Sequence, residues 1–248
     1  MGNTEKNRFG LVGKNISYSF SKAYFTKKFK DLGLNDHSYE NFDIARIEDL
    51  QNLLSTNKDL KGLNITIPYK EAVIPYLSEL NPKARKIGAV NTVKFTKKGL
   101  KGYNTDIYGF KKSIKPFLKT HHKKALILGT GGASKAVAFV FGELGIKYKH
   151  VSRDPGKNQL GYVDLNEKIL KKHTIIVNST PLGTYPNIDG KPDIPYEMLS
   201  AKHVLFDLIY NPEKTIFLQK GEKQGATISN GLRMLELQAE KSWRIWNS

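Results

Sequence analysis

A short apolar segment followed directly by a glycine-rich turn restricts the fold of this chain more than any other feature. Residues 124–128 (KALIL) have the pattern of a buried strand, and the turn GTGGAS follows at 129–134. Apolar residues at helical spacing then run to Gly145, and residues 148–152 have the pattern of a second strand. This order of strand, turn, helix and strand predicts the parallel α/β unit that binds dinucleotides.

The turn also indicates what the unit binds. Glycines permit a tight turn, and the start of the following helix offers backbone N–H groups and the positive end of its dipole to a pyrophosphate. A tight turn without a ligand is the alternative, but the flanking strand and helix favour nucleotide binding. Where NAD enzymes carry an acidic residue, about 20 residues on, the sequence reads Ser152-Arg153-Asp154. The guanidinium of Arg153 suits a 2′-phosphate, which favours NADP, whereas Asp154 is an unfavourable neighbour for a phosphate.

The residues before this unit alternate between strand and helix patterns and end in a hairpin. Strands are expected at 8–13, 37–42 and 60–67, helices at 23–32, 47–54 and after Pro68, and the hairpin at 89–95 and 100–103. This pattern predicts a mostly parallel, mixed sheet.

The residues after the glycine turn continue the alternation of strands and helices. Strands are expected at 175–178, 204–207 and 226–229, and helices at 215–224 and 232–246. A further helix is expected at 107–119, between the hairpin and the glycine turn. The whole chain is therefore expected to be a two-domain α/β protein with a cleft between its domains. Residues 1–105 and 231–248 are expected to form a substrate-binding catalytic domain with a mixed sheet, and residues 106–230 a Rossmann-type NADP-binding domain.

Composition excludes several classes of protein. The 248 residues contain no apolar run near the ~20 residues that span a bilayer, and the first residues lack the apolar core of a secretory signal. The chain has no cysteine, which excludes disulfides, thiolate nucleophiles and cysteine metal sites. We therefore predict a cytoplasmic protein, monomer or homodimer, that contacts no membrane.

The net charge of +17 is the unusual value in the composition. Its lysines are scattered in pairs such as Lys27-Lys28 and Lys171-Lys172, without a basic arm. This distribution favours solvated faces that attract small anions, and we predict a small-molecule substrate with no nucleic-acid partner.

Short motifs are spaced along nearly the whole chain. They are SFS at 19–21 after Gly13, NITIPYK at 64–70, GAVNT at 88–92, GYNTDIYG at 102–109, GTGGA at 129–133, NSTPLG at 178–183 and DLIYNP at 207–212, followed by Gly231, Met234-Leu235 and Gln238-Ala239. In order and spacing they resemble the motifs of the shikimate dehydrogenase family. The resemblance extends from Gly13 to Gln238.

The resemblance implies an oxidoreductase that reversibly reduces 3-dehydroshikimate to shikimate with NADP, a step of chorismate and aromatic amino-acid biosynthesis. In that family pattern, Lys70 is the proton donor and Asp106 holds the substrate hydroxyl and pairs with Lys70, so that both act on the C3 oxygen while the nicotinamide supplies the hydride. An isolated lysine is more often a solvated surface charge, and Asp106 alone would fit an N-cap of the helix beside it. Their positions, after Pro-Tyr at a strand end and at a domain boundary, favour the chemical roles.

The remaining site residues are also implied by the resemblance. Ser19 and Ser21, helped by Tyr210, would bind the substrate carboxylate. Thr66, Asn91 and Gln238, with Asp106, would hold the hydroxyls. Taken singly, Ser21 also fits an N-cap, Asn91 a turn residue and Gln238 an exposed helix residue. The cofactor set comprises Gly129, Gly131, Gly132, Ala133, Ser152, Arg153, Thr180, Leu208 and Gly231; no metal site is expected.

The chain departs from the family pattern at several positions. Asn15 and Lys22 stand where the family commonly has proline, Thr184 where it often has methionine, and Asp154 where it has a small hydroxyl residue. These departures concern the serine loop, the nicotinamide region and the strength of the NADP preference.

Two other functions compete with this interpretation. A quinate/shikimate dehydrogenase that uses NAD shares most of the motifs, but Arg153 and the paired serines favour the first interpretation. A non-catalytic protein could bind nucleotide or nucleic acid through the basic surface, but it would have no need for both Lys70 and Asp106.

Overall fold

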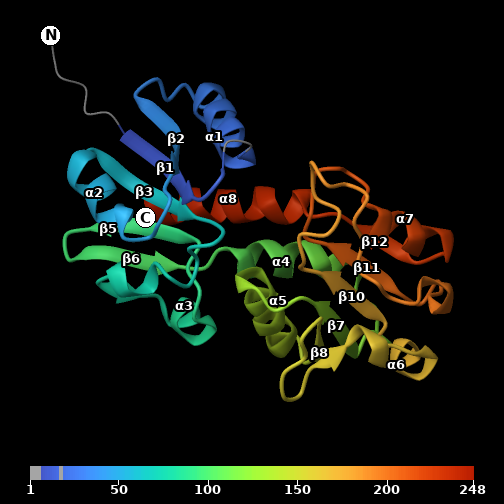
Figure 1. The fold of residues 1–248 in the computed structure, drawn as a ribbon. Helices are drawn as coiled ribbons and strands as arrows, with labels where there is room; N and C mark the ends of the chain where they lie inside the picture. Colours follow the sequence, from blue (N-terminus) through green and yellow to red (C-terminus); the bar gives the residue numbers. More distant parts are fainter. Residues whose placement is uncertain (1–6, 17–18) are drawn as a thin grey trace, which may run out of the picture. The chain divides into compact units, whose positions relative to one another are not determined.

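The chain forms two compact α/β units, shown in the computed structural model of Figure 1, which describes residues 7–16 and 19–248. Unit 1 comprises the residues up to Thr105 and Gln238–Ser248, and unit 2 comprises Asp106–Leu237. We predicted the second boundary at residue 231. In the structure it lies between Leu237 and Gln238, inside α8 (Leu232–Trp246), so no turn marks the change. Residues 1–6, where we predicted no secretory signal, lie outside the described residues.

Unit 1 is built on a mixed six-stranded sheet with the order β2-β1-β3-β5-β6-β4. Its strands are β1 (Asn7–Gly13), β2 (His37–Asp43), β3 (Leu60–Ile65), β4 (Glu79–Leu80), β5 (Thr92–Thr96) and β6 (Gly99–Tyr103). Strand β1 pairs in parallel with β2 and β3, whereas β5 is antiparallel to both β3 and β6. The predicted mixed sheet and hairpin are therefore confirmed.

The helices of unit 1 differ from the predictions in three places, one of them the unpredicted helix at Pro82–Ile87. They are α1 (Phe20–Asp31), α2 (Asp49–Thr56), α3 (Pro82–Ile87) and the end of α8. The N-cap of α1 is Ser19, so the cap expected at Ser21 is wrong. The helix expected after Pro68 is a run of turns ending in a 3₁₀ helix at Ile74–Tyr76, because Pro75 cannot occupy an α-helix interior.

Unit 2 is built on a six-stranded sheet with the order β12-β11-β10-β7-β8-β9, in which each strand runs parallel to its neighbours. Its strands are β7 (Lys124–Leu128), β8 (Lys147–Ser152), β9 (Leu160–Gly161), β10 (Ile175–Asn178), β11 (Val204–Asp207) and β12 (Thr227–Ser229). Its helices are α4 (Asp106–Ile114), α5 (Gly132–Glu143), α6 (Glu167–Lys172), α7 (Ile216–Lys223) and the start of α8. The predicted Rossmann-type topology is confirmed, while β9 and α6 were not predicted.

Short 3₁₀ helices complete unit 2 at Lys115–Phe117, Tyr162–Asp164 and Tyr196–Met198. Helix α4 was expected to reach residue 119, but Pro116 disfavours a helical backbone just before it, and α4 ends at Ile114. Among the described residues, no helix is both long enough and apolar enough to cross a membrane.

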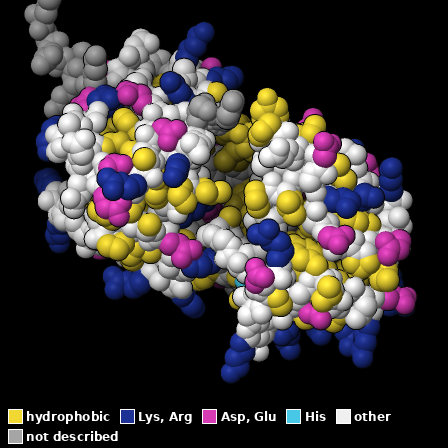
Figure 2. Space-filling view, in the orientation of Figure 1, with side chains coloured by type: hydrophobic (Ala, Val, Ile, Leu, Met, Phe, Trp, Pro, Cys, Tyr) yellow, Lys and Arg dark blue, Asp and Glu magenta, His cyan; other side chains and the backbone are white. Residues whose placement is uncertain are grey.

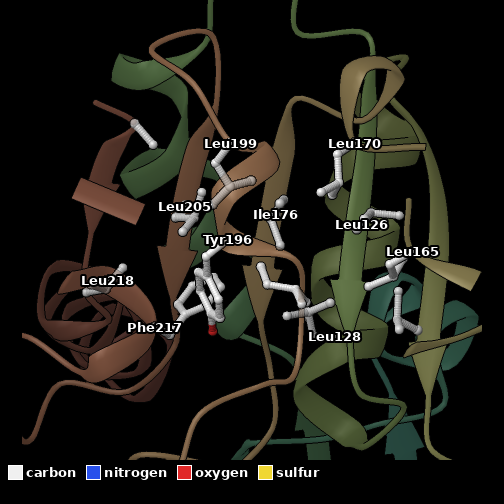
Figure 3. Close-up of a cluster of buried hydrophobic side chains, with 13 residues drawn as sticks. Leu126, Leu128, Leu165, Leu170, Ile176, Tyr196, Leu199, Leu205, Phe217 and Leu218 are labelled. Atoms are coloured by element: carbon white, nitrogen blue, oxygen red, sulfur yellow. The ribbon is translucent and has the colours of Figure 1, made fainter. Parts of the chain in front are cut away.

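The core of unit 2 explains the continuous apolar character of its central strands. A sheet covered on both faces buries every side chain of a strand, and all residues of β10 and β11 are buried. Figure 3 shows Leu126, Ile176 and Leu205 from neighbouring strands packed beside Phe217 and other apolar side chains. The sheet edge that carries the glycine turn therefore rests on a buried apolar core.

An aromatic cluster attaches α8 to the sheet of unit 1. Phe9 of β1 stacks on Trp246 with ring centroids 4.8 Å apart, and Phe25 of α1 stacks on Tyr39 of β2 at 4.6 Å. The indole nitrogen Nε1 of Trp246 donates a hydrogen bond to the carbonyl of Val93 at 3.0 Å. The C-terminal helix is thus held on strands from the opposite end of the sequence.

This packing needs a glycine on β3. A Cβ atom built at Gly62 would lie 2.3 Å from Nε1 of Trp246, closer than real Cβ contacts come. We expect Gly62→Ala to lower the free energy of unfolding by about 1–3 kcal/mol through overpacking. The control is Gly142→Ala on α5, where an added Cβ meets nothing within 4 Å; it should stabilise by about 0.5–1 kcal/mol. Thermal and denaturant unfolding measure both effects, and equal behaviour of the two variants would contradict the packing argument.

Candidate functional site

In unit 2, the loops that follow three parallel strands carry most of the predicted cofactor residues. Strands β7, β10 and β11 end at Leu128, Asn178 and Asp207 and lie side by side in the sheet. Ligands of open α/β sheets bind at this carboxyl edge. The glycine turn follows the first of these strands, Thr180 the second and Leu208 the third.

The glycine turn has the geometry that an anion site requires. Gly129 has φ of 102°, a left-handed value that favours glycine, and a Cβ there would lie 3.0 Å from Oγ of Ser179. Gly131 is the N-cap of α5, and a Cβ added to it would meet nothing within 4 Å. The turn therefore leaves the backbone N–H groups at the start of α5, a 12-residue helix that begins at Gly132, accessible to a phosphate.

A buried carboxylate links the other two loops. Oδ1 of Asp207 accepts hydrogen bonds from Nδ2 of Asn178 at 3.1 Å and from the backbone N–H of Ile209 at 3.0 Å. Its Oδ2 accepts from the hydroxyl of Thr215 at 2.6 Å. Oδ1 of Asn178 in turn accepts from the backbone N–H and the hydroxyl of Thr180, at 3.0 and 2.7 Å. Burial raises the pKa of Asp207 to about 6, although these hydrogen bonds oppose the shift.

Gly231 is required by a close backbone approach. A Cβ atom on it would lie 2.1 Å from the carbonyl oxygen of Leu208, and its N–H donates to the carbonyl of Ile209 at 2.9 Å. Leu208 and Gly231, both predicted cofactor residues, therefore lie against each other at the start of α8.

The residues expected to select the cofactor lie at the end of β8. Ser152 is half-buried, and Arg153 and Asp154 are exposed. Burial raises the pKa of the Tyr162 phenol, and the positive charge of Arg153 opposes that rise, so the two side chains are near each other. Within the part of the chain that the structure describes, Arg153 forms no ion pair, which leaves its guanidinium accessible to a phosphate.

In unit 1, the two serines of the first motif differ in their surroundings. The hydroxyl of Ser19 is buried and has no hydrogen-bond partner among the described residues. Ser21 is buried at the start of α1, near the Tyr39 phenol, whose hydroxyl donates to Oδ1 of Asn64 at 2.8 Å. A buried hydroxyl without a partner is unfavourable unless a ligand satisfies it, so Ser19 fits a residue that binds a polar ligand group.

Lys70 follows β3 on a turn that a buried tyrosine anchors. The hydroxyl of Tyr69 donates to the carbonyl of Ile44 at 2.8 Å, and the carbonyl of Lys70 accepts from the N–H of Val90 at 2.7 Å. Both Thr66 and Lys70 are half-buried. The backbone of this turn is therefore held at two points.

The structure brings Asn91 and Gln238 together although 147 positions separate them. Nδ2 of Asn91 donates to Oε1 of Gln238 at 3.4 Å, and Oδ1 of Asn91 accepts from the N–H of Thr105 at 2.6 Å. Both side chains are buried, so Gln238 is not the exposed helix residue that the sequence alone also allowed. In unit 2, Asp106 is buried at the first position of α4, and Tyr210 is half-buried after β11.

On one face of the molecule, the positive charge is spread among other side chains. On the face that Figure 2 shows, Lys and Arg side chains lie scattered among acidic and apolar ones. Several lysines are paired with carboxylates, such as Lys101 with Glu79 and Lys111 with Glu143. Among residues 7–16 and 19–248, no group of three or more His, Cys, Asp or Glu side chains has the arrangement of a metal site.

Comparison with known proteins decides the family. Residues 11–93 match the family model described as the shikimate dehydrogenase substrate binding domain. Shikimate dehydrogenase (NADP(+)) of Methanosphaera stadtmanae is 36% identical over 96% of this chain and 90% of its own length. The chain belongs to the shikimate dehydrogenase family, as its motifs predicted.

Solved structures of relatives have the same fold. Shikimate 5-dehydrogenase from Thermus thermophilus, in complex with NADP(H) and shikimate, matches with a TM-score of 0.85 and 31% identity, over 96% of this chain and 92% of that chain. Quinate dehydrogenase from Corynebacterium glutamicum, in complex with NAD, also has a TM-score of 0.85, with 27% identity over 97% and 93% of the two chains. The predicted two-domain α/β fold is thereby confirmed.

Sequence reasoning missed the residues that support the predicted site of this shikimate dehydrogenase family member. Asn64, Thr92 and Thr105 lie inside the motifs given above, but no role in the site was predicted for them. None was predicted for Tyr39 or Ser242 either. All five are buried and lie in one hydrogen-bonded group with Asn91 and Gln238. The signal for Ser242 was its spacing, since it lies one helical turn after Gln238.

The buried Asp207 should make stability depend on pH. Its folded pKa of about 6 lies above the ordinary value of 3.8, so the folded state binds the proton more tightly and is favoured below about pH 4. This stabilisation is lost as pH rises through about 6. We expect the difference in unfolding free energy between wild type and Asp207→Asn to change by about 2 kcal/mol between about pH 4 and pH 7, with wild type relatively more stable at the lower pH. Denaturant titrations at several pH values measure this difference, and a difference independent of pH would contradict the assignment.

Proposed function

We propose that this chain is an NADP-dependent shikimate dehydrogenase that reversibly reduces 3-dehydroshikimate to shikimate. One observation supports it above the others: the likeness to NADP(+)-dependent relatives extends over 96% of the chain and includes both units. The accessible glycine turn and the unpaired guanidinium of Arg153 fit the pyrophosphate and the 2′-phosphate of that cofactor.

The proposed chemistry assigns a separate task to each group. Bound NADPH supplies a hydride to C3 of the substrate. Lys70 donates a proton to the C3 oxygen, and its positive charge stabilises the negative charge that develops there. Asp106 accepts a hydrogen bond from the substrate hydroxyl and fixes its direction. In the oxidation of shikimate the same groups act in reverse, and Lys70 in its neutral form takes the proton.

The remaining substrate contacts follow from the chemistry of the side chains. The unpartnered hydroxyl of Ser19 donates to the substrate carboxylate, with Ser21 and Tyr210 beside it. Thr66, Asn91 and Gln238 hold the ring hydroxyls. Short neutral donors of this kind discriminate against analogues that lack a hydroxyl, because the buried amides would lose their partners. The assignment of 1–105 with 231–248 to substrate and of 106–230 to cofactor, the cytoplasmic location and the monomeric or dimeric state stay predictions.

The roles of Lys70 and Asp106 are tested by substitution. We expect Lys70→Ala and Asp106→Asn each to lower kcat for shikimate oxidation by about 10²–10⁴-fold, the usual contribution of a positioned acid or base. Lys97→Ala, at the exposed tip of the β5–β6 hairpin, is the control and should match wild type. Steady-state absorbance of the nicotinamide gives the rates. A near-normal kcat in Lys70→Ala would show that Lys70 is not the proton donor.

Arg153 is expected to set the cofactor preference. Loss of its charged hydrogen bonds should lower kcat/KM for NADP about tenfold in Arg153→Ala and leave kcat/KM for NAD nearly unchanged. Asp154→Ser should shift the preference the other way, because it removes a negative charge beside the phosphate. Arg46→Ala, at an exposed arginine of unit 1, is the control. An equal loss with both cofactors in Arg153→Ala would contradict recognition of the 2′-phosphate.

A second candidate function is oxidation of quinate with NAD. The observation that favours it is Asp154, an exposed acidic residue at the end of β8, where NAD enzymes hold the ribose diol. Arg153 beside it favours NADP, so we rank this function second.

A further inference from the structure

A buried serine on the C-terminal helix lies among the side chains that hold the Asn91 and Gln238 amides. Ser242 has no exposed surface, and its Oγ lies 3.0 Å from Nδ2 of Asn64, 2.8 Å from Oγ1 of Thr92 and 3.2 Å from Oγ1 of Thr105. It also donates to the carbonyl of Gln238 at 3.0 Å. A single hydroxyl thus contacts β3, β5, the segment before α4 and its own helix.

The orientation of the neighbouring amides follows from backbone groups that can only donate or only accept a hydrogen bond. The backbone N–H of Thr105 can only donate, so the atom of Asn91 at 2.6 Å from it is Oδ1, and Nδ2 faces Gln238. The Gln238 atom that receives this bond is therefore Oε1, which also accepts from the hydroxyl of Thr105 at 3.3 Å. No described residue accepts a hydrogen bond from Nε2 of Gln238, so this side chain presents an N–H group for a ligand oxygen.

The orientation of the Asn64 amide follows in the same way. The carbonyl of Asn91 can only accept, so the atom of Asn64 at 3.1 Å from it is Nδ2, which also points at Ser242. Oδ1 of Asn64 then accepts from the Tyr39 hydroxyl at 2.8 Å. With bonds accepted from Asn64 and Thr92 and one donated to Gln238, the Ser242 hydroxyl uses its one donor and both acceptor sites.

We propose that Ser242 is a positioning residue for substrate binding, which acts by holding the hydroxyl of Thr92 away from Oδ1 of Asn91 and thereby keeping the amides of Asn91 and Gln238 in place. The inference rests on the proposed function, since it needs those amides to hold the hydroxyls of shikimate. Without Ser242, the Thr92 hydroxyl turns to Oδ1 of Asn91, which lies 3.2 Å away, and competes there with the backbone N–H of Thr105. The Gln238 amide then loses its fixed direction.

The test compares Ser242→Ala with a control serine in the same local setting. Ser113 is also buried in a helix and also donates to the carbonyl one turn before it, but within the described part of the chain its hydroxyl bonds no predicted substrate-binding residue. We expect Ser242→Ala to raise KM for shikimate about three- to tenfold, with KM for NADP unchanged. Ser113→Ala should change neither constant. Thr92→Val, which removes the partner hydroxyl on β5 and leaves α8 intact, should raise KM for shikimate in the same direction.

A double-mutant cycle with Gln238→Ala separates positioning from simple loss of stability. If Ser242 acts through Gln238, Ser242→Ala should add little to KM for shikimate once Gln238 is alanine. Two results would overturn the inference: independent, multiplying effects of Ser242→Ala and Gln238→Ala on KM for shikimate, or an unchanged KM for shikimate in both Ser242→Ala and Thr92→Val. In either case, turnover of shikimate by the wild type would still uphold the proposed function. Wild-type enzyme that neither turns over nor binds shikimate would overturn both.

Discussion

The packing of α8 on the first sheet is the constraint on which the arrangement of unit 1 depends. Phe9, Phe25 and Tyr39 surround Trp246, and the indole N–H bonds the backbone of β5. This contact joins the two ends of the sequence and sets the rotation and depth of the helix. As a result, Gln238 and Ser242 on the same helix meet Asn64, Asn91 and Thr105, which come from strand ends and loops of the N-terminal segment. Apolar packing therefore determines where the polar residues of the site lie.

In unit 2, a buried carboxylate determines where the loops with predicted site residues lie. Asp207 accepts hydrogen bonds from Asn178, Ile209 and Thr215. Asn178 in turn accepts one from Thr180 and so holds the loop that carries it. Loops at the carboxyl edge of a parallel sheet have few contacts of their own, so a hydrogen-bonded centre beneath them gives them a defined shape. The raised pKa of Asp207 is the consequence of burying an acid for this purpose. Each unit thus supports its predicted site residues with buried polar groups.

The sequence allowed most of the fold to be predicted, because the determining signals are local. The glycine turn between β7 and α5 predicted the parallel sheet of unit 2, and apolar periodicity predicted α8 with the bounds that the structure has. Prolines mark two of the errors: Pro75 excludes the helix expected after Pro68, and Pro116 ends α4 early. Helix α3 also carried local signals, an Asn81 cap with Pro82 at its first position and Gly88 at its end, which were overlooked. The role of Ser242 depends on contacts between distant segments, which no local pattern encodes.

The central claim is that this member of the shikimate dehydrogenase family oxidises shikimate with NADP, and it is tested most directly with the wild-type protein. Absorbance at the nicotinamide band would be followed with shikimate or quinate, each offered with NADP or NAD. The account predicts rapid reduction of NADP with shikimate and much lower kcat/KM for every other combination. Equal or higher efficiency with quinate and NAD would contradict it, and would indicate that Asp154 rather than Arg153 decides which cofactor the protein uses.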